Sequence, residues 1–140
     1  MVNIIITGGS SSIGRELISK LSLKKVNIIY QINKSKPFIK KKNINFIRSD
    51  FCNHVSLKKF INFVTKKTNK IDFLIHLPSS KIQIKKFEDY SWFEINSQIN
   101  IQVRSLHLLL TSLIKKKILS RKTKIIILGS EATRGKPPRG

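Results

Sequence analysis

The sequence predicts an α/β fold with a Rossmann-type parallel sheet and helices on both of its faces. Short β-branched runs alternate with amphipathic stretches of helical periodicity. The first run, VNIII, leads into a Gly- and Ser-rich turn, TGGSSSIG, which opens directly onto a helical stretch, RELISKL. Because strands that alternate with helices form β-α-β units with right-handed crossovers, we expect every strand to run parallel to its neighbours.

Each element has its own signature along the chain. Residues 2–6 lack polar alternation, so we expect the first strand to be buried on both faces. Helical spacing of apolar residues predicts a helix after the Gly/Ser turn, a second over residues 55–67 and a long third over about residues 91–117. The other apolar runs predict strands at residues 26–30, 44–50, 71–77 and 124–130.

The five strands are expected in the order 3-2-1-4-5, which places the Gly/Ser turn at the switch point of the sheet. The length suits one domain over residues 1–140. The single cysteine, Cys52, excludes an internal disulfide and suits a reducing compartment. No signal-peptide pattern is present, and no apolar run reaches the roughly 18 residues of a membrane helix. We therefore expect a cytoplasmic protein that has no membrane partner.

The formal net charge of +21 has two interpretations. Lysines neutralise phosphates, which would indicate nucleic-acid binding. Lys, Ile and Asn also recur throughout the chain, as in proteins encoded by AT-rich genomes. The lysines are scattered along the sequence without interleaved aromatics or a nucleic-acid-binding motif. The sequence therefore favours biased composition, and only a contiguous basic face would support a nucleic-acid partner.

The Gly/Ser turn has the composition of a phosphate-binding site. Gly8 allows a tight turn, and Gly14 allows close packing of the helix on the strand. Backbone N–H groups and the positive end of the helix would then face phosphate oxygens. Taken alone the pattern is weak, because Gly/Ser loops are common.

The sequence around the Gly/Ser turn strengthens its interpretation as a phosphate-binding site. The turn resembles the TGxxxGxG motif of the short-chain dehydrogenase/reductase family, classical type. SDF after the third strand, IDFLIHLPSS at the fourth, the W…N pattern of SWFEINSQIN and KIIILGSEATRG at the fifth resemble further motifs of that family, in the same order. Within the family, the chain most resembles the β-ketoacyl-acyl-carrier-protein reductases. The resemblance implies an NAD(P)(H)-dependent oxidoreductase of carbonyl, alcohol or acyl substrates, homo-oligomeric when complete.

The resemblance also implies roles for individual residues. Asn100 and Ser130 correspond to catalytic residues, and no metal site is expected, since the three histidines lack ligand spacing. Cofactor contacts are implied for the turn and for the ends of the third and fourth strands: Thr7, Gly8, Ser11, Ser12, Ile13, Gly14, Asp50, Phe51, His76 and Pro78.

Some positions depart from the family pattern. Ser12 replaces the middle glycine, which requires a negative φ at this residue. His76-Leu-Pro78-Ser replaces Asn-Asn-Ala-Gly, so one backbone N–H is lost and the polar group that braces the central strands is changed. The extended, epimerase-like branch is an alternative. Its TGxxGxxG would need glycine at Ser11, and the long third helix favours the classical branch.

The choice of dinucleotide rests on charge. Enzymes that use NAD commonly place a carboxylate at the end of the second strand for the ribose 2′-OH. Here no Asp or Glu occurs between Glu16 and Asp50, and Lys34 follows the second strand. We expect NADP(H) to be favoured over NAD(H), with Lys34 near the 2′-phosphate; the alternative is an ordinary solvated lysine.

The proton-transfer pair of the family, Tyr-x-x-x-Lys after the catalytic serine, is missing. Both tyrosines, Tyr30 and Tyr90, precede Ser130. We interpret the chain as the N-terminal part of such an enzyme, truncated after the fifth strand and inactive alone. The alternative is a non-catalytic dinucleotide-binding remnant or regulatory module.

Overall fold

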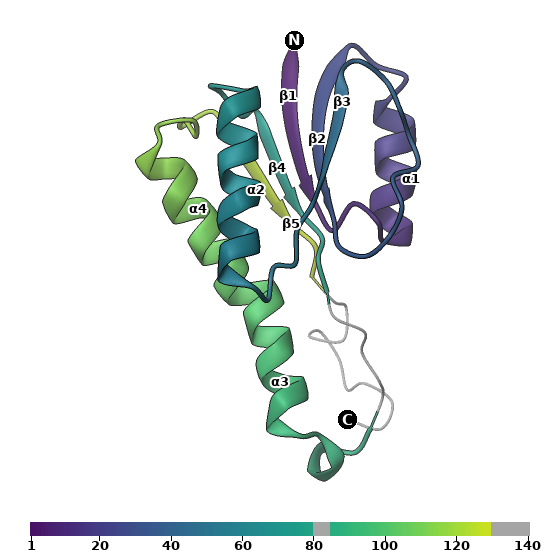
Figure 1. Ribbon diagram of the computed structural model, residues 1–140, viewed down its shortest axis with the longest axis vertical. Coiled ribbons are helices and arrows are strands. Elements are labelled where there is room, and N and C mark those ends of the chain that lie inside the picture. Colours follow the sequence, from purple (N-terminus) through teal and green to yellow (C-terminus); the bar gives the residue numbers. More distant parts are fainter. Residues whose placement is uncertain (80–84, 130–140) are drawn as a thin grey trace.

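The computed structural model describes residues 1–79 and 85–129. Five strands form one sheet in the order β3-β2-β1-β4-β5, which confirms the predicted topology (Figure 1). All four pairings are parallel. All strands therefore begin at one edge of the sheet, the amino edge, and end at the opposite carboxyl edge. The strands are β1 (Val2–Thr7), β2 (Val26–Ile32), β3 (Ile44–Arg48), β4 (Phe73–His76) and β5 (Lys124–Ile127).

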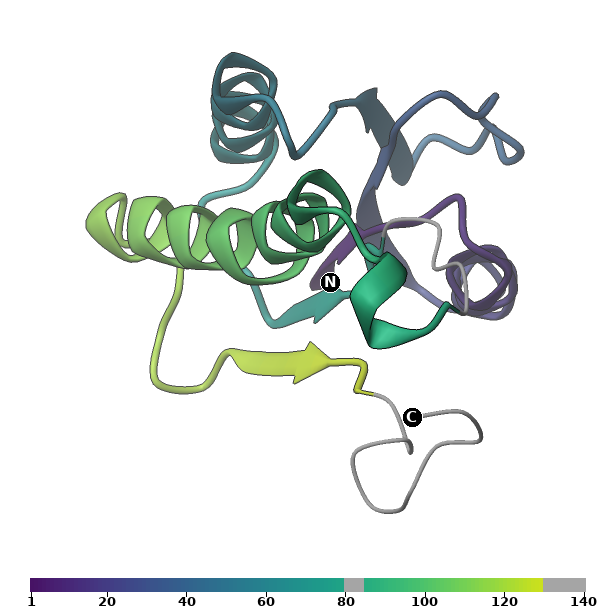
Figure 2. The same cartoon turned by 90° about the horizontal axis from the view of Figure 1, so that it is seen from below.

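Helices cover both faces of the sheet. Helix α1 lies on one face, and α2 and α4 lie on the other (Figures 1 and 2). Side-chain caps fix where helices begin: Ser11 accepts a hydrogen bond from the Gly14 N–H, and Asn53 accepts one from the Ser56 N–H. The helices are α1 (Ser12–Leu21), α2 (His54–Lys67), α3 (Trp92–Ile99) and α4 (Ser105–Lys115), with a 3₁₀ turn η1 (Phe87–Asp89) and a π-helical turn η2 (Asn100–Arg104).

Two hydrophobic layers flank the sheet. Strand β1 sends Ile5 into the layer beneath α2 and α4, and Ile4 and Ile6 into the layer beneath α1. This confirms that β1 is buried on both faces. The layer beneath α1 also holds Tyr30, whose side chain is fully buried.

Several boundaries differ from the sequence prediction: β2 continues to Ile32 and β3 ends at Arg48. The long third helix is divided by the π turn η2 into α3 and α4. Strand β4 is shorter than predicted and starts at Phe73, because the preceding Asp72 bonds to the start of β1. Strand β5 ends at Ile127, and all its residues are exposed. Within the described ranges, no helix is both long and apolar enough to cross a membrane.

Candidate functional site

The turn after β1 leaves no room for a side chain at two of its glycines. Gly8 has a φ of +72°, and a Cβ there would lie 2.7 Å from the backbone nitrogen of Pro78. A Cβ on Gly14 would lie 2.7 Å from the Gly8 carbonyl oxygen. Both contacts are with backbone, which cannot move aside as a flexible side chain can. The turn therefore holds the start of α1 directly against the end of β1.

Gln31, a residue that the sequence reasoning missed, holds this turn in place. Its Oε1 accepts from the Gly8 N–H at 2.8 Å, and its Nε2 donates to the Ser49 carbonyl at 2.6 Å. The Gln31 carbonyl in turn accepts from the Gly9 N–H at 2.8 Å. The N–H groups of Gly8 and Gly9 are therefore used inside the protein. The available signal was a polar residue within the apolar run of β2.

The start of α1 offers the unpaired donors instead. Ser11 caps the helix: its Oγ accepts from the Gly14 N–H at 3.0 Å and donates to the Gly8 carbonyl at 2.9 Å. No hydrogen bond within residues 1–79 and 85–129 uses the N–H of Ser12 or Ile13. Both residues are exposed, and the first turn carries no carboxylate. These two N–H groups lie at the positive end of the helix dipole, where the chemistry favours an anion.

Ser12 fits without strain. It is the first residue of α1, and the only non-glycine residue with positive φ in the described ranges is Lys117. The φ of Ser12 is therefore negative, as the substitution for glycine requires.

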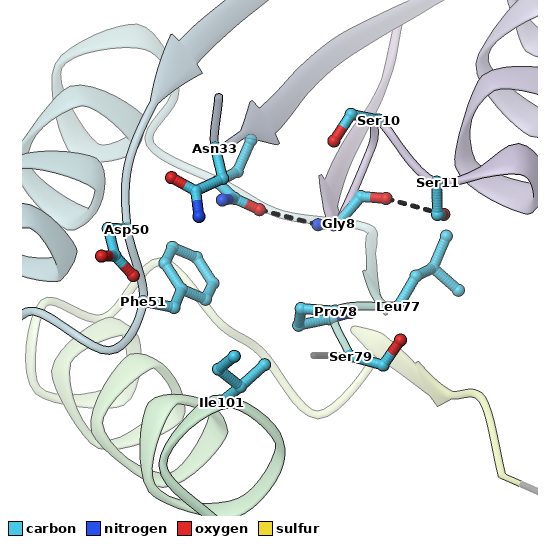
Figure 3. A pocket seen from close by; sticks show the side chains of 11 residues that line it. Gly8, Ser10, Ser11, Asn33, Asp50, Phe51, Leu77, Pro78, Ser79 and Ile101 are labelled. Atoms are coloured by element: carbon cyan, nitrogen blue, oxygen red, sulfur yellow. Dashed lines mark hydrogen bonds between the residues drawn. The ribbon is translucent and has the colours of Figure 1, made fainter. Parts of the chain in front are cut away.

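A pocket of about 220 Å³ opens beside the turn at the carboxyl edge (Figure 3). It brings together Gly8, Ser11, Asp50, Phe51 and Pro78 from the predicted set. Its lining comes from the ends of β1, β2, β3 and β4 and from η2: Gly8, Ser10, Ser11, Gln31, Asn33, Asp50, Phe51, Leu77, Pro78, Ser79 and Ile101.

The segment after β3 forms one wall of this pocket. Asp50 is exposed, and its Oδ1 accepts from the Cys52 N–H at 2.9 Å. Phe51 is buried and packs edge-on against Phe60, with ring centroids 5.3 Å apart. Phe51 thus anchors the loop to the core and leaves the Asp50 carboxylate facing solvent at the pocket.

The segment after β2 lines the pocket beside the segment after β3, because the two strands are neighbours in the sheet (Figure 3). Asn33 lines the pocket, whereas its exposed neighbour Lys34 does not. The described lining contains one carboxylate, that of Asp50, and it follows β3. No carboxylate of the lining therefore stands at the end of β2.

His76 ends β4 and is only 3% exposed. Its Nδ1 lies 2.8 Å from the Thr7 hydroxyl, which joins the ends of β4 and β1. Burial lowers the pKa of His76 to about 4, although the carbonyls of Gln102 and Ile101 act in the opposite direction. The imidazole is therefore neutral near pH 7. Neither His76 nor Thr7 lines the pocket beside the turn; together they brace the ends of β4 and β1 behind it.

Asn100 begins the π turn η2. Its carbonyl accepts from the Ser105 N–H, and the buried Ser105 hydroxyl donates to the carbonyl of Ile101. The widened turn rotates the helix, so that Ile101 lines the pocket while Gln102 lines a second cavity. Asn100 lines neither of these two cavities. Such π turns are frequent at functional sites.

The second cavity, of about 790 Å³, lies between the ends of β4 and β5 and helix α4, and it is mostly apolar. It adjoins the first pocket, because Leu77, Pro78 and Ser79 line both. His76 and Gln102 are among its polar residues. The predicted catalytic Ser130 lies outside the described residues.

Neither tyrosine is among the described residues that line these cavities. Tyr30 is buried against Phe38 and Phe46, and burial raises its pKa above the ordinary value. The Tyr90 hydroxyl accepts from the Lys85 N–H at 3.2 Å, beside η1.

Known proteins share this architecture. The family model of short chain dehydrogenase matches residues 2–140. A short chain dehydrogenase family protein from Francisella tularensis superposes with a TM-score of 0.83 at 22% identity, covering 98% of this chain and 55% of that one. No curated protein is significantly similar in sequence.

Two further solved structures contain a dinucleotide. A short chain dehydrogenase from Leptospira borgpetersenii with bound NAD⁺ gives a TM-score of 0.82 at 21% identity, covering 98% of this chain and 54% of that one. One from Burkholderia cenocepacia in complex with NADP gives 0.81 at 17% identity, covering 99% and 59%. The chain thus spans little more than half the length of these structures.

Proposed function

The chain belongs to the short-chain dehydrogenase family, whose members are NAD(P)-dependent oxidoreductases, and on that basis we propose that it binds a nicotinamide dinucleotide along the carboxyl edge of the sheet. One observation carries the proposal. A glycine cradle with no room for a Cβ at Gly8 or Gly14 presents the N–H groups of Ser12 and Ile13, which have no hydrogen-bond partner among the described residues. These two N–H groups would hold the pyrophosphate at the start of α1.

The pocket beyond the turn suits the adenosine half. Asp50 would accept from the adenine amino group, and the backbone at Phe51 would contact the ring. Pro78 would close the opposite side, since its backbone already packs on Gly8. His76 and Thr7 would act from behind by fixing the end of β4 relative to β1.

We propose that the dinucleotide is NADP(H). A ribose 2′-OH would find no carboxylate at the end of β2, because Gln31 is turned toward Gly8 and Ser49. A 2′-phosphate would meet the Asn33 amide and the hydroxyl of Ser10, which line the pocket, with the Lys34 ammonium close by in sequence. Lys34 does not line the pocket in this structure, so its side chain would have to turn toward the pocket to reach the 2′-phosphate.

The adjoining apolar cavity suits the nicotinamide end and a carbonyl, alcohol or acyl substrate. When bound, the nicotinamide supplies or accepts hydride. Ser130 would orient the substrate oxygen, whereas Asn100, which lines neither cavity, would act from the π turn through a water. The sequence has no tyrosine after Ser130 to move the proton. We therefore expect these 140 residues, tested on their own, to bind the cofactor without turning it over, and a non-catalytic dinucleotide-binding module would behave in the same way.

Dinucleotide titration tests this proposal. We expect the chain to bind NADPH more tightly than NADH in calorimetry. Lys34→Gln should weaken NADPH binding about fivefold, because an exposed ionic contact contributes roughly 1 kcal/mol. The affinity for NADH should stay unchanged. Lys36→Gln, two residues away and also exposed, is the matched control. Equal binding of the two dinucleotides, or equal effects of the two variants, would contradict the NADP(H) assignment.

A further inference from the structure

The lysines that are scattered along the sequence converge in space on the amino edge of the sheet. Each connection that enters a strand at this edge is rich in cations: residues 24–25 before β2, 40–42 before β3, 66–70 before β4 and 115–124 at the start of β5. Fourteen of the 28 Lys and Arg residues lie here, and all fourteen are exposed. They are Lys24, Lys25, Lys40, Lys41, Lys42, Lys66, Lys67, Lys70, Lys115, Lys116, Lys117, Arg121, Lys122 and Lys124.

Almost no negative charge opposes them. Among the described residues, Asp72 is the one carboxylate on the strand-entering connections of this edge. Lys70 lies 2.7 Å from it, and the Asn3 N–H donates to its Oδ2 at 2.9 Å. These partners lower the pKa of Asp72, so it stays ionised and satisfied within the edge. The remaining cations have no carboxylate beside them on these connections.

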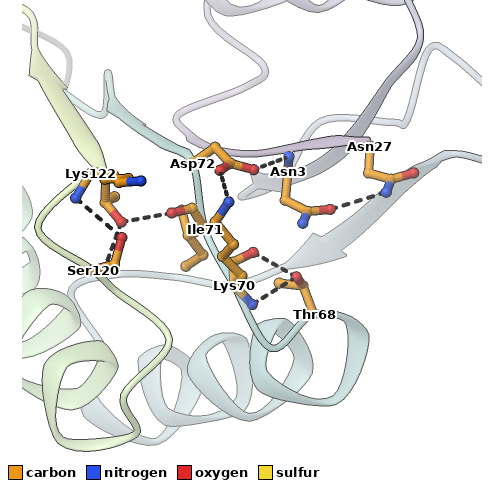
Figure 4. A network of polar contacts seen from close by, with 9 residues as sticks. Asn3, Asn27, Thr68, Lys70, Ile71, Asp72, Ser120 and Lys122 are labelled. Carbon is orange, nitrogen blue, oxygen red and sulfur yellow. Dashed lines mark hydrogen bonds and ion pairs between the residues drawn. The ribbon is translucent and has the colours of Figure 1, made fainter.

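A hydrogen-bonded frame holds the connections in place (Figure 4). Asn27 donates to the Asn3 side chain at 3.0 Å, linking β2 to β1. The Thr123 hydroxyl donates to the Ile71 carbonyl at 2.7 Å, linking the entries of β5 and β4. Lys41 donates to the Ser22 carbonyl at 3.0 Å, linking the entry of β3 to the end of α1. The basic connections are therefore anchored to one another.

Helix stabilisation explains only part of this arrangement. Cations at helix C-termini interact favourably with the helix dipole, which accounts for Lys66, Lys67 and Lys115 in the last turns of α2 and α4. Lys40, Lys42 and Lys122 lie on connections outside any helix. Helix stabilisation therefore does not explain why these lysines gather at one edge. Together with the helix-terminal lysines they form the contiguous basic face that a nucleic-acid partner would require.

We propose that the amino edge is a docking surface for the phosphate backbone of double-stranded nucleic acid, separate from the dinucleotide site at the carboxyl edge. Five strands about 4.8 Å apart give an edge about 20 Å wide. That width faces about six phosphates of one strand, at about 3.4 Å each. Lysines bind such phosphates without reading sequence.

Two observations favour a duplex over other polyanions. Single-strand binding uses exposed aromatics on which bases stack. The most exposed aromatics among the described residues, Phe87, Trp92 and Phe93, lie beyond the carboxyl edge on η1 and α3. Phe46, at 37% exposure, lies within β3 and on none of the basic connections. A membrane surface would need buried apolar area as well as charge. On the described connections that enter the five strands at this edge, only Met1 and Leu23 are large, apolar and highly exposed.

Binding to a labelled DNA duplex of about 20 base pairs, followed by anisotropy between about 50 and 200 mM salt, tests the proposal. About six phosphate contacts predict a log–log slope near −5. Lys25→Gln/Lys40→Gln/Lys42→Gln/Lys122→Gln should weaken binding about tenfold or more and flatten the slope by about 2 to 4. The control Lys36→Gln/Lys58→Gln/Lys59→Gln/Lys86→Gln removes the same charge from exposed lysines elsewhere. It should change binding less than about twofold.

Equal losses in the two variants would overturn the proposal, because net charge alone would then account for binding. Tighter binding to vesicles rich in phosphatidylserine than to the duplex would also overturn it. If the four-site variant melts early, Lys40→Gln/Lys122→Gln against Lys36→Gln/Lys86→Gln makes the same comparison with loop residues only. Saturating NADPH should leave duplex binding unchanged, and a chain that binds no dinucleotide should still bind the duplex.

Discussion

Replacing Gly14 by alanine should destabilise the protein, although helix propensity alone predicts that it would stabilise α1. Alanine in a helix is more favourable than glycine by about 1 kcal/mol. Here the new Cβ would lie 2.7 Å from the Gly8 oxygen and 2.9 Å from the Gly9 backbone, where ordinary contact begins at 3.4 Å. Because Gly14 sits in α1 and Gly8 ends β1, the helix must move away from the sheet.

Forcing such an overlap costs about 1–3 kcal/mol, and more where backbone must move. After the propensity gain, we expect a net destabilisation of about 1–2 kcal/mol. For a chain of this size that corresponds to a melting temperature about 3–8 °C lower. The shift also displaces the N–H groups of Ser12 and Ile13, so NADPH affinity should fall about tenfold or more.

Thermal melting by circular dichroism and NADPH titration measure both effects. Ser19→Ala is the matched control, because Ser19 is exposed on the same helix and meets no such backbone overlap. It should leave stability within about 0.5 kcal/mol and leave binding unchanged. A Gly14→Ala protein that melts higher and still binds NADPH normally would refute the cradle.

Three further outcomes are expected. Burial lowers the pKa of His76 to about 4 in the folded protein, below its usual 6.5. As the pH falls, this histidine is therefore protonated in the unfolded chain before it is protonated in the folded protein. Stability should therefore fall by up to about 3 kcal/mol as pH drops from about 6.5 to 4, and His76→Asn should flatten this dependence in denaturant melts. Strand β5 exposes Ile125 and Ile127 at 44% and 57% on an open edge. Ile125→Lys/Ile127→Lys should therefore raise the soluble fraction, whereas the equally charged Leu23→Lys/Val55→Lys should not. The chain should oxidise NADPH with acetoacetyl or quinone substrates no faster than its Ser130→Ala variant, because lack of a positioned proton donor alone costs about 10²–10⁴-fold.

The sheet was predictable because its signal is local. Ile-rich runs mark buried parallel strands, and the Gly/Ser turn marks the switch point. Gly8 and Gly14 could be assigned on the same grounds, and the structure places them in backbone contact. Where a motif sits between two regular elements, sequence spacing is enough to locate it.

Other features depend on long-range contacts that spacing does not encode. Gln31 was missed because its partners are Gly8 and Ser49, each 18 or more residues away. The π turn at Asn100 was missed because the apolar spacing carries no signal for the extra residue, which shifts the buried face: Ile99 and Val103 are exposed, whereas Leu109 and Leu113 are buried. The basic edge arises only when parallel topology brings the strand entries together.

Backbone amide shifts on addition of NADPH test the dinucleotide site most directly. In ¹⁵N-resolved spectra, the account predicts the largest changes at Ser12 and Ile13, smaller ones at Asp50, and little change at Gly9, whose N–H stays bonded to the Gln31 carbonyl. Gly14→Ala should abolish the pattern, and Ser19→Ala should retain it. Shifts confined to other regions, or no shifts at millimolar NADPH, would contradict the claim that this turn holds a dinucleotide.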